Sequence, residues 1–178
     1  MLVRPARAED TADLLDLERA AFGGNDEADL VAALLADPSA LPIINLVAEE
    51  AGTILGHVLF THAVVKTAGA SVDATNLAPL AVTPSAQRTG VGQALCRQGI
   101  VDAEKLGIGL VFVLGHIGYY PRFGFRPALP LGLDAPYPID PAVSDAWMVL
   151  ETRPGLIGTV RGSVSCASAL MHPEMWAE

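Results

Sequence analysis

The sequence predicts an α/β (α+β) fold, and three stretches carry this prediction. Residues 11–22 have the apolar spacing of an amphipathic helix. Residues 43–48 and 53–65 are apolar, β-branched segments separated by a short turn, which is typical of an antiparallel hairpin. Residues 77–106 run from a buried strand through a glycine turn into a helix. With 178 residues, 51% of them hydrophobic, the chain is long enough for one domain with a substantial core.

The N-terminal part of the chain predicts a strand followed by two helices. Residues 1–6 are a short strand candidate that a proline and charged residues end. In the helix over 11–22, leucines recur on one face while acidic residues and an arginine face outward. A Gly-Gly pair ends this helix, and Asn25 is expected to cap the next one. The second helix carries three carboxylates in its first turn and ends at Pro38.

A second turn, residues 66–71, follows the hairpin and leads into a strand that ends at Val82. Pro79 interrupts this strand, although proline is normally confined to strand edges and bulges because it lacks an N–H donor. A bulge at Pro79 and a strand that begins only at Leu80 are the two possible explanations.

The histidines and cysteines do not predict a metal site. His57 and His62 lie on opposite faces of one strand by the two-residue period, so we interpret both as structural. Cys96 and Cys166 have no Cys-x-x-Cys spacing. Cys96 falls inside the predicted helix after the glycine turn, where inert packing is the expected role.

The turn after Val82 has the features of an anion-binding site. Gln87, Gly90 and Gly92 precede a helix, so backbone N–H groups and about half a positive charge from the helix dipole converge there. A Rossmann fingerprint is excluded because Leu95 stands where its third small residue belongs. A P-loop is excluded because Gln93 replaces the lysine.

A second motif comes after the apolar strand at residues 110–114. Tyr120 stands four residues before Gly124-Phe125, which is similar to the Tyr-x-x-x-Gly-Phe segment of the GNAT superfamily of N-acetyltransferases. The Gln87-x-x-Gly90-x-Gly92 turn resembles the Q/R-x-x-G-x-G/A signature of the same family. The resemblance covers roughly residues 1–127 well, and the rest of the chain matches loosely.

The resemblance implies a mixed, mostly antiparallel sheet with helices on both faces. It implies an N-acetyltransferase domain over residues 1–150, with residues 151–178 as a C-terminal extension that packs on the same domain. The family's fourth strand bulges and parts from the fifth, and the thioester arm of acetyl-CoA lies between them. This resemblance favours the bulge as the explanation of Pro79. The first two helices of such enzymes form one wall of the acceptor pocket.

The resemblance also assigns site residues. The strand residues would bond the pantetheine arm and supply the oxyanion donor, and the turn would hold the pyrophosphate. The residues assigned to acetyl-CoA are Leu80, Ala81, Val82, Gln87, Arg88, Thr89, Gly90, Val91, Gly92 and Gln93. Tyr120 would be the general acid that protonates the leaving thiolate. The family often has an Asn shortly before this tyrosine, and residues 115–118 offer none, so Tyr119 or water stays an alternative acid.

No general base is assigned. Asp73, Glu18 and Glu27 lie on segments that could border the pocket, and we interpret each as a solvated surface carboxylate. No metal is expected.

The expected activity is direct transfer of the acetyl group to a primary amine of a small molecule or peptide. A non-catalytic GNAT-like module that binds acyl-CoA as a sensor or regulatory subunit is the alternative, and a longer acyl donor also stays open. The net charge of −9 argues against nucleic acid or anionic membrane as a partner. Without a membrane-length apolar run or a signal peptide, a cytoplasmic protein is expected.

The C-terminal part carries weaker signals. Residues 127–141 are rich in Pro and Gly and predict a meandering loop, residues 146–151 predict a strand, and residues 156–164 are a second strand candidate. Residues 167–178 have no firm signal. This extension could cap the acceptor pocket, form a homodimer with a second subunit, or take no part in the chemistry.

Overall fold

Strand pairing joins the strands of residues 1–177, the part of the chain that the computed structural model describes, into one mixed sheet. The strands are β1 (Leu2–Pro5), β2 (Ile44–Glu50), β3 (Thr53–Lys66), β4 (Ser71–Val82), β5 (Leu110–Leu114), β6 (Arg126–Pro127), β7 (Leu133–Asp134), β8 (Trp147–Glu151) and β9 (Gly162–Cys166). The order is β1-β2-β3-β4-β5-β8-β6, while β9 pairs with β3 and β7 pairs with β9. The β4–β5 and β7–β9 pairs are parallel and the others are antiparallel, which confirms the expected mixed, mostly antiparallel sheet.

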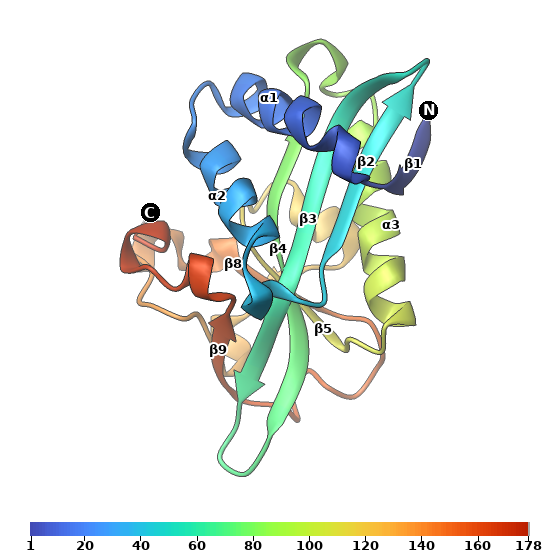
Figure 1. The fold of residues 1–178 in the computed structure, drawn as a ribbon. Helices are drawn as coiled ribbons and strands as arrows, with labels where there is room; N and C mark the ends of the chain where they lie inside the picture. The colour runs from blue at the N-terminus through green and yellow to red at the C-terminus, as the bar shows by residue number, and fades with distance from the viewer. Residues whose placement is uncertain (178) are drawn as a thin grey trace.

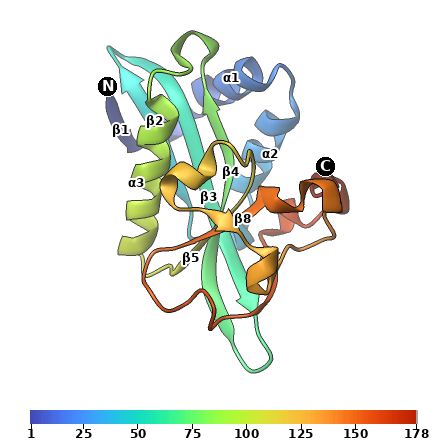
Figure 2. The same cartoon turned by 180° about the vertical axis from the view of Figure 1, so that it is seen from behind.

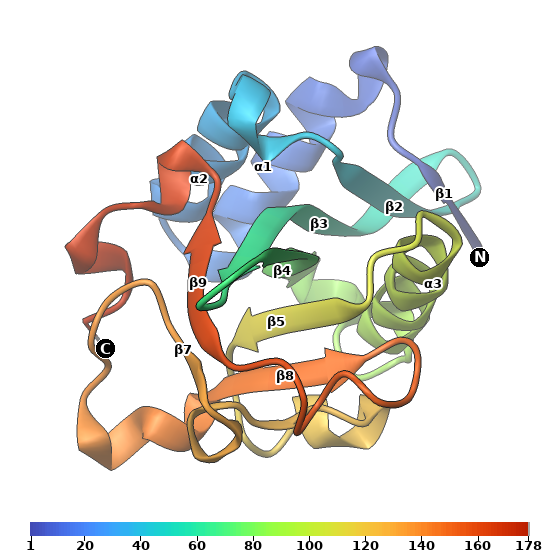
Figure 3. The same ribbon diagram turned by 90° about the horizontal axis from the view of Figure 1, so that it is seen from below.

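In the described part of the chain, three α-helices cover the two faces of this sheet. Helices α1 (Thr11–Phe22) and α2 (Asp26–Leu35) lie on one face, toward the viewer in Figure 1. Helix α3 (Val91–Lys105) lies on the other face and stands in front of the sheet in Figure 2. Figure 3, seen from below, shows α1 and α2 separated from α3 by the strands. Within residues 1–177, no helix combines the length and the apolar character needed to cross a membrane.

Apolar side chains fill the space on both faces. Beneath α3, Phe60 of β3 and Leu95 of the helix belong to the same buried cluster. Beneath α1 and α2, Leu14 and Val31 pack with Leu59 of β3. Because successive β3 residues point to opposite faces, this one strand is buried on both sides.

The bulge expected at Pro79 is confirmed. In the pairing of β3 with β4, Phe60 lies opposite Leu77 and Val58 lies opposite Leu80. Between these pairs β4 has two residues and β3 has one, so Pro79 stands where the ladder is interrupted. The missing N–H of proline therefore costs little at this position.

Strands β4 and β5 part where the sequence predicted a gap. Their parallel pairing runs from Ala74 with Leu110 to Leu77 with Val113 and goes no further, although β4 continues to Val82. The last part of β4 therefore has its β5-facing backbone edge free.

Two local expectations were wrong. Asn25 stands at the N-cap of α2, but its side chain does not cap the helix; Oδ1 accepts a hydrogen bond from the Arg19 guanidinium instead, at 3.2 Å. The strand expected over 156–164 is shifted, since β9 spans Gly162–Cys166. The Glu151 carboxylate accepts hydrogen bonds from the backbone N–H groups of residues 156 and 157, and these bonds hold that stretch in a turn.

The segment after β9 packs against α2 and β8. The backbone N–H of Ala169 donates to Asp37 Oδ2 at 3.0 Å, just beyond the end of α2. Trp176 donates from Nε1 to the Leu170 carbonyl at 2.8 Å, and its ring stacks edge-on against Trp147. The segment thus forms a fixed wall beside α2.

Candidate active site

A cavity of about 750 Å³ lies where the end of β4 meets the start of α3. We call it the turn cavity. Its lining residues come from three elements that stand out in the sequence: the end of β4, the glycine turn and the second motif. They are Leu80, Val82, Gln87, Arg88, Gly90, Gly92, Gln93, His116, Tyr119, Tyr120 and Arg122.

Side-chain hydrogen bonds and two left-handed residues shape the turn at the floor of this cavity. The Gln87 amide donates to the Val82 carbonyl at 3.2 Å, which ties the turn to the end of β4. The Thr89 hydroxyl donates to the Ala86 carbonyl at 2.5 Å. Arg88 has φ of 62° and Gly90 has φ of 94°, and the left-handed region is uncommon for a residue with a side chain. Such alternation of backbone hand gathers N–H groups into a concave anion site in front of the helix.

The structure brings together most of the predicted coenzyme residues, but not all of their side chains. Seven of the ten line the turn cavity. Thr89 is committed to the turn, Val91 is buried in the core under α3, and Ala81 is buried on the opposite face of the sheet beside His57. Ala81 and Val91 could therefore meet a ligand only through their backbone, whereas the Thr89 side chain is exposed.

Both tyrosines of the second motif reach the turn cavity in different ways. Tyr120 is 8% exposed, and its ring packs against Gly115 and edge-on against Phe125. Tyr119 is half-buried, and its hydroxyl lies beside Gly92. Burial raises the pKa of both phenols, so both keep their protons at neutral pH.

Sequence reasoning missed two basic residues in the turn cavity, His116 and Arg122. The Arg122 guanidinium lies over the Tyr119 ring, 4.4 Å from its centroid, and Nε donates to the Tyr119 carbonyl at 2.8 Å. Arg122 lies inside the second motif, so a basic residue in that motif could have indicated positive charge at the site. Among the described residues that line this cavity no carboxylate occurs, so it is locally cationic in a chain of net charge −9.

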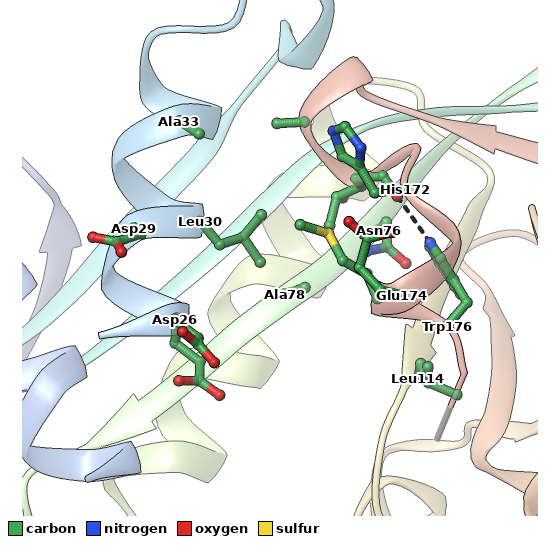
Figure 4. A pocket seen from close by; sticks show the side chains of 14 residues that line it. Asp26, Asp29, Leu30, Ala33, Asn76, Ala78, Leu114, His172, Glu174 and Trp176 are labelled. Carbon is green, nitrogen blue, oxygen red and sulfur yellow. Dashed lines mark hydrogen bonds between the residues drawn. The ribbon is translucent and has the colours of Figure 1, made fainter. Parts of the chain in front are cut away.

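A second cavity, of about 640 Å³, lies on the opposite face of the sheet. We call it the acidic cavity. Figure 4 shows it between α2, strand β4 and the C-terminal segment. Its lining residues are Asp26, Glu27, Asp29, Leu30, Ala33, Asn76, Ala78, Leu114, Ala169, Leu170, His172, Glu174, Met175 and Trp176.

The two cavities share strand β4 at the point where it leaves β5. Leu80 lines the turn cavity, while Ala78, on the other side of the bulge, lines the acidic cavity together with Leu114 at the end of β5. The parted strands therefore lie between a cationic cavity and an acidic one.

The structure separates the three carboxylates considered as bases. Glu27 lines the acidic cavity, and Asp73 is exposed near the far end of β4. The expectation of a solvated Glu18 was wrong, because its side chain is 0% exposed. Its Oε1 lies 2.5 Å from His57 Nδ1, and His57 Nε2 lies 2.7 Å from Asn45 Oδ1.

Burial raises the pKa of the Glu18 carboxyl, and the hydrogen bond with His57 opposes that shift in part. His57 is structural, as expected, since it joins α1 to the sheet from inside the core. Burial also raises the pKa of the Cys96 thiol to about 12, which fits inert packing.

Comparison with known proteins agrees with the two motifs. The family model described as "Acetyltransferase (GNAT) domain" matches residues 2–128. The chain is 45% identical over 161 residues to the uncharacterized N-acetyltransferase YjhQ of Escherichia coli (strain K12), covering 89% of this chain and 87% of that protein.

Two solved structures resemble the whole chain. The GNAT family N-acetyltransferase YhbS from Escherichia coli, solved in complex with CoA, superposes with a TM-score of 0.85 at 27% identity and covers 96% of this chain and 92% of its own. A GNAT family acetyltransferase from Brucella melitensis, solved in complex with acetyl-CoA, has a TM-score of 0.75 at 29% identity and covers 95% and 97%. Together with the strand, turn and helix described above, these matches show that the chain belongs to the GNAT acetyltransferase family.

Proposed function

We propose that this protein transfers the acetyl group of acetyl-CoA directly to a primary amine. The observation that carries the proposal is the pair of cavities on opposite faces of the sheet, both of which border β4 near the point where it parts from β5. One cavity is cationic, as a coenzyme with phosphates requires, and the other is acidic, as an amine requires.

The turn cavity would hold the coenzyme. The pyrophosphate would accept hydrogen bonds from the backbone N–H groups of residues 88–93. The α3 dipole and Arg122 would add positive charge. The thioester arm would lie against the free edge of residues 80–82, whose backbone has no β5 partner. Two structural relatives were solved in complex with CoA and with acetyl-CoA, which supports a coenzyme of this kind as the ligand.

Direct transfer requires little from the protein. The amine nitrogen attacks the acetyl carbonyl, a C–N bond forms, and a backbone N–H of residues 80–82 stabilises the oxyanion. The C–S bond then breaks, and the Tyr120 phenol gives its proton to the thiolate. Its position in the turn cavity supports this role, and its raised pKa means that the phenol still carries its proton at neutral pH; Tyr119 is the alternative acid. Water carries away the amine proton, so no base is assigned.

The extension has a place in this proposal. Residues 1–150 would form the transferase domain, and residues 151–178 would pack on it and supply a wall of the acidic cavity. The contact of Trp176 with Trp147 supports that packing.

A panel of primary amines with acetyl-CoA tests the proposal. Release of free thiol that depends on an amine, together with a mass increase of one acetyl group on that amine, is the expected result. Tight CoA binding without turnover on any amine would favour the sensor or regulatory alternative.

A further inference from the structure

We propose that the acidic cavity takes an aliphatic diamine, a small dication with an apolar linker, as the acetyl acceptor. This inference rests on the proposed transferase function and narrows its acceptor to one chemical class. Three properties of the cavity support it: the charge of its walls, one buried polar atom on its floor, and the apolar surface between them.

The charge is negative on two separate walls. Asp26, Glu27 and Asp29 lie in the first turn of α2, where the helix dipole by itself accounts for carboxylates. That explanation does not extend to Glu174, which belongs to the C-terminal segment and lines the same cavity (Figure 4). Among the described residues that line the cavity there is no Lys or Arg. An ammonium group is therefore attracted, and a ligand that carries a carboxylate is repelled.

The floor offers an unused hydrogen-bond acceptor. Asn76 of β4 is 3% exposed and lines the cavity, and its Oδ1 has no hydrogen-bond partner among residues 1–177. Buried amide oxygens are normally paired, so this atom points to a donor that arrives with the ligand. An amine or ammonium N–H is such a donor, and a hydrogen bond with a charged donor is stronger than a neutral one.

Apolar surface connects Asn76 with the carboxylates. Leu30 and Ala33 of α2, Ala78 of β4 and Leu114 of β5 supply it, as Figure 4 shows for these labelled side chains. A chain of methylene groups would cover this surface while its two nitrogens reach Asn76 at one end and the acidic rim at the other. The opposite wall is fixed by Trp176, which donates to the Leu170 carbonyl at 2.8 Å, so the cavity needs little rearrangement to bind.

The reaction with a diamine is the same direct acetyl transfer as in the proposed function. One ammonium group of the bound diamine first gives a proton to water, and the uncharged nitrogen attacks the acetyl carbonyl. The C–N bond forms as the C–S bond breaks, and the thiolate takes a proton from the acid of the proposed function, Tyr120. The acetylated nitrogen then loses a second proton to water. The products are the mono-N-acetyl diamine and CoA, and acetylation removes one of the two positive charges that the cavity recognises.

Calorimetry and turnover with three probes of similar length test the inference: 1,4-diaminobutane, 1-aminobutane and 4-aminobutanoate. With CoA present, the diamine should bind at least about tenfold more tightly than the monoamine, as expected for one added charged contact. The amino acid should bind most weakly. A monoamine that binds as well as the diamine would overturn the inference.

Variants assign the binding to the cavity. Asn76→Leu should weaken diamine binding about tenfold and leave CoA affinity unchanged. Asp26→Asn with Glu174→Gln, which leaves the buried floor intact, should weaken it in a salt-dependent way. Asp13→Asn with Glu104→Gln removes the same charge from exposed sites on α1 and α3 and should change nothing. Equal effects of the two charge pairs would overturn the inference.

The two proposals fail in different ways. Diamine binding without acetyl transfer would overturn the transferase function and leave the ligand class standing. Acetylation of monoamines or peptide N-termini with no preference for the diamine would overturn the ligand class and leave the function standing.

Discussion

The Tyr119 hydroxyl occupies the space that a side chain on Gly92 would need, because a Cβ placed on Gly92 would stand 2.7 Å from the phenolic oxygen. The glycine turn and the second motif are thus in direct contact at the turn cavity. A substitution at Gly92 would therefore displace a tyrosine as well as intrude on the phosphate site. By contrast, Gly90 has open space above it and needs glycine for its positive φ.

Gly92→Val should reduce CoA affinity by about tenfold or more, because the turn and Tyr119 cannot both keep their positions. Calorimetry with CoA measures the change. Gly69→Val is the matched control, since Gly69 has open space around it and no positive φ. Undiminished CoA affinity in a folded Gly92→Val protein would refute the placement of the pyrophosphate.

Arg88→Ala should weaken CoA binding by about three- to fivefold at low salt, with a smaller difference at high salt, because the contact is exposed and electrostatic. Titrations with CoA at two ionic strengths measure this. Arg7→Ala removes an exposed charge far from the turn cavity and serves as the control. A loss that does not depend on salt would show that Arg88 acts through the shape of the turn.

Tyr120→Phe should lower kcat by about 10² or more and leave the KM for acetyl-CoA nearly unchanged, as expected for a general acid. The ring packing against Phe125 is kept in this variant, so stability should hold. Because burial raises the pKa of Tyr120, wild-type kcat should show no alkaline decline from this group up to about pH 10. If Tyr119→Phe lowers kcat instead, Tyr119 is the general acid. If neither variant lowers kcat, water protonates the thiolate.

Gly99→Ala should destabilise the fold, although alanine favours a helix by about 1 kcal/mol. A Cβ at Gly99 would overlap the Phe60 ring, and overpacking of this kind costs about 1–3 kcal/mol. Urea denaturation measures the difference. Phe60→Leu combined with Gly99→Ala should recover part of the loss relative to the sum of the single changes. A Gly99→Ala protein more stable than wild type would contradict the close approach of α3 to β3.

Glu18 should make stability depend on pH. Its folded pKa is raised by burial, so the contribution of the protonated form is complete below the ordinary pKa and is lost as pH rises through the folded value. Glu18→Gln keeps an oxygen near His57 without the charge. The variant should therefore gain stability relative to wild type in denaturant unfolding as the pH rises above the ordinary glutamate pKa of about 4.3. A difference that does not change with pH would show that Glu18 does not titrate in the folded protein.

Local patterns in the sequence determined much of the framework. The helix at 11–22 and the strand at 110–114 match α1 and β5, because each has its full apolar period within its own length. The missing N–H of Pro79 left a bulge or a late strand start as the alternatives, and the family resemblance favoured the bulge that the structure has. The turn and the second motif each indicated one side of the candidate site, because the residues of each motif are close together in the chain.

Tertiary structure decided what depends on partners far apart in the chain. Glu18 shows a helical surface pattern, and only its contact with His57 of β3 reveals that it is buried. Asn76 reads as one more strand residue until the sheet and α2 leave its Oδ1 without a partner among residues 1–177. The acidic cavity joins α2 to Glu174 near the C-terminus, and no local period links segments so distant. Periodicity determines which face of an element is apolar, whereas the pairing of those faces determines which polar groups are left to bind a ligand.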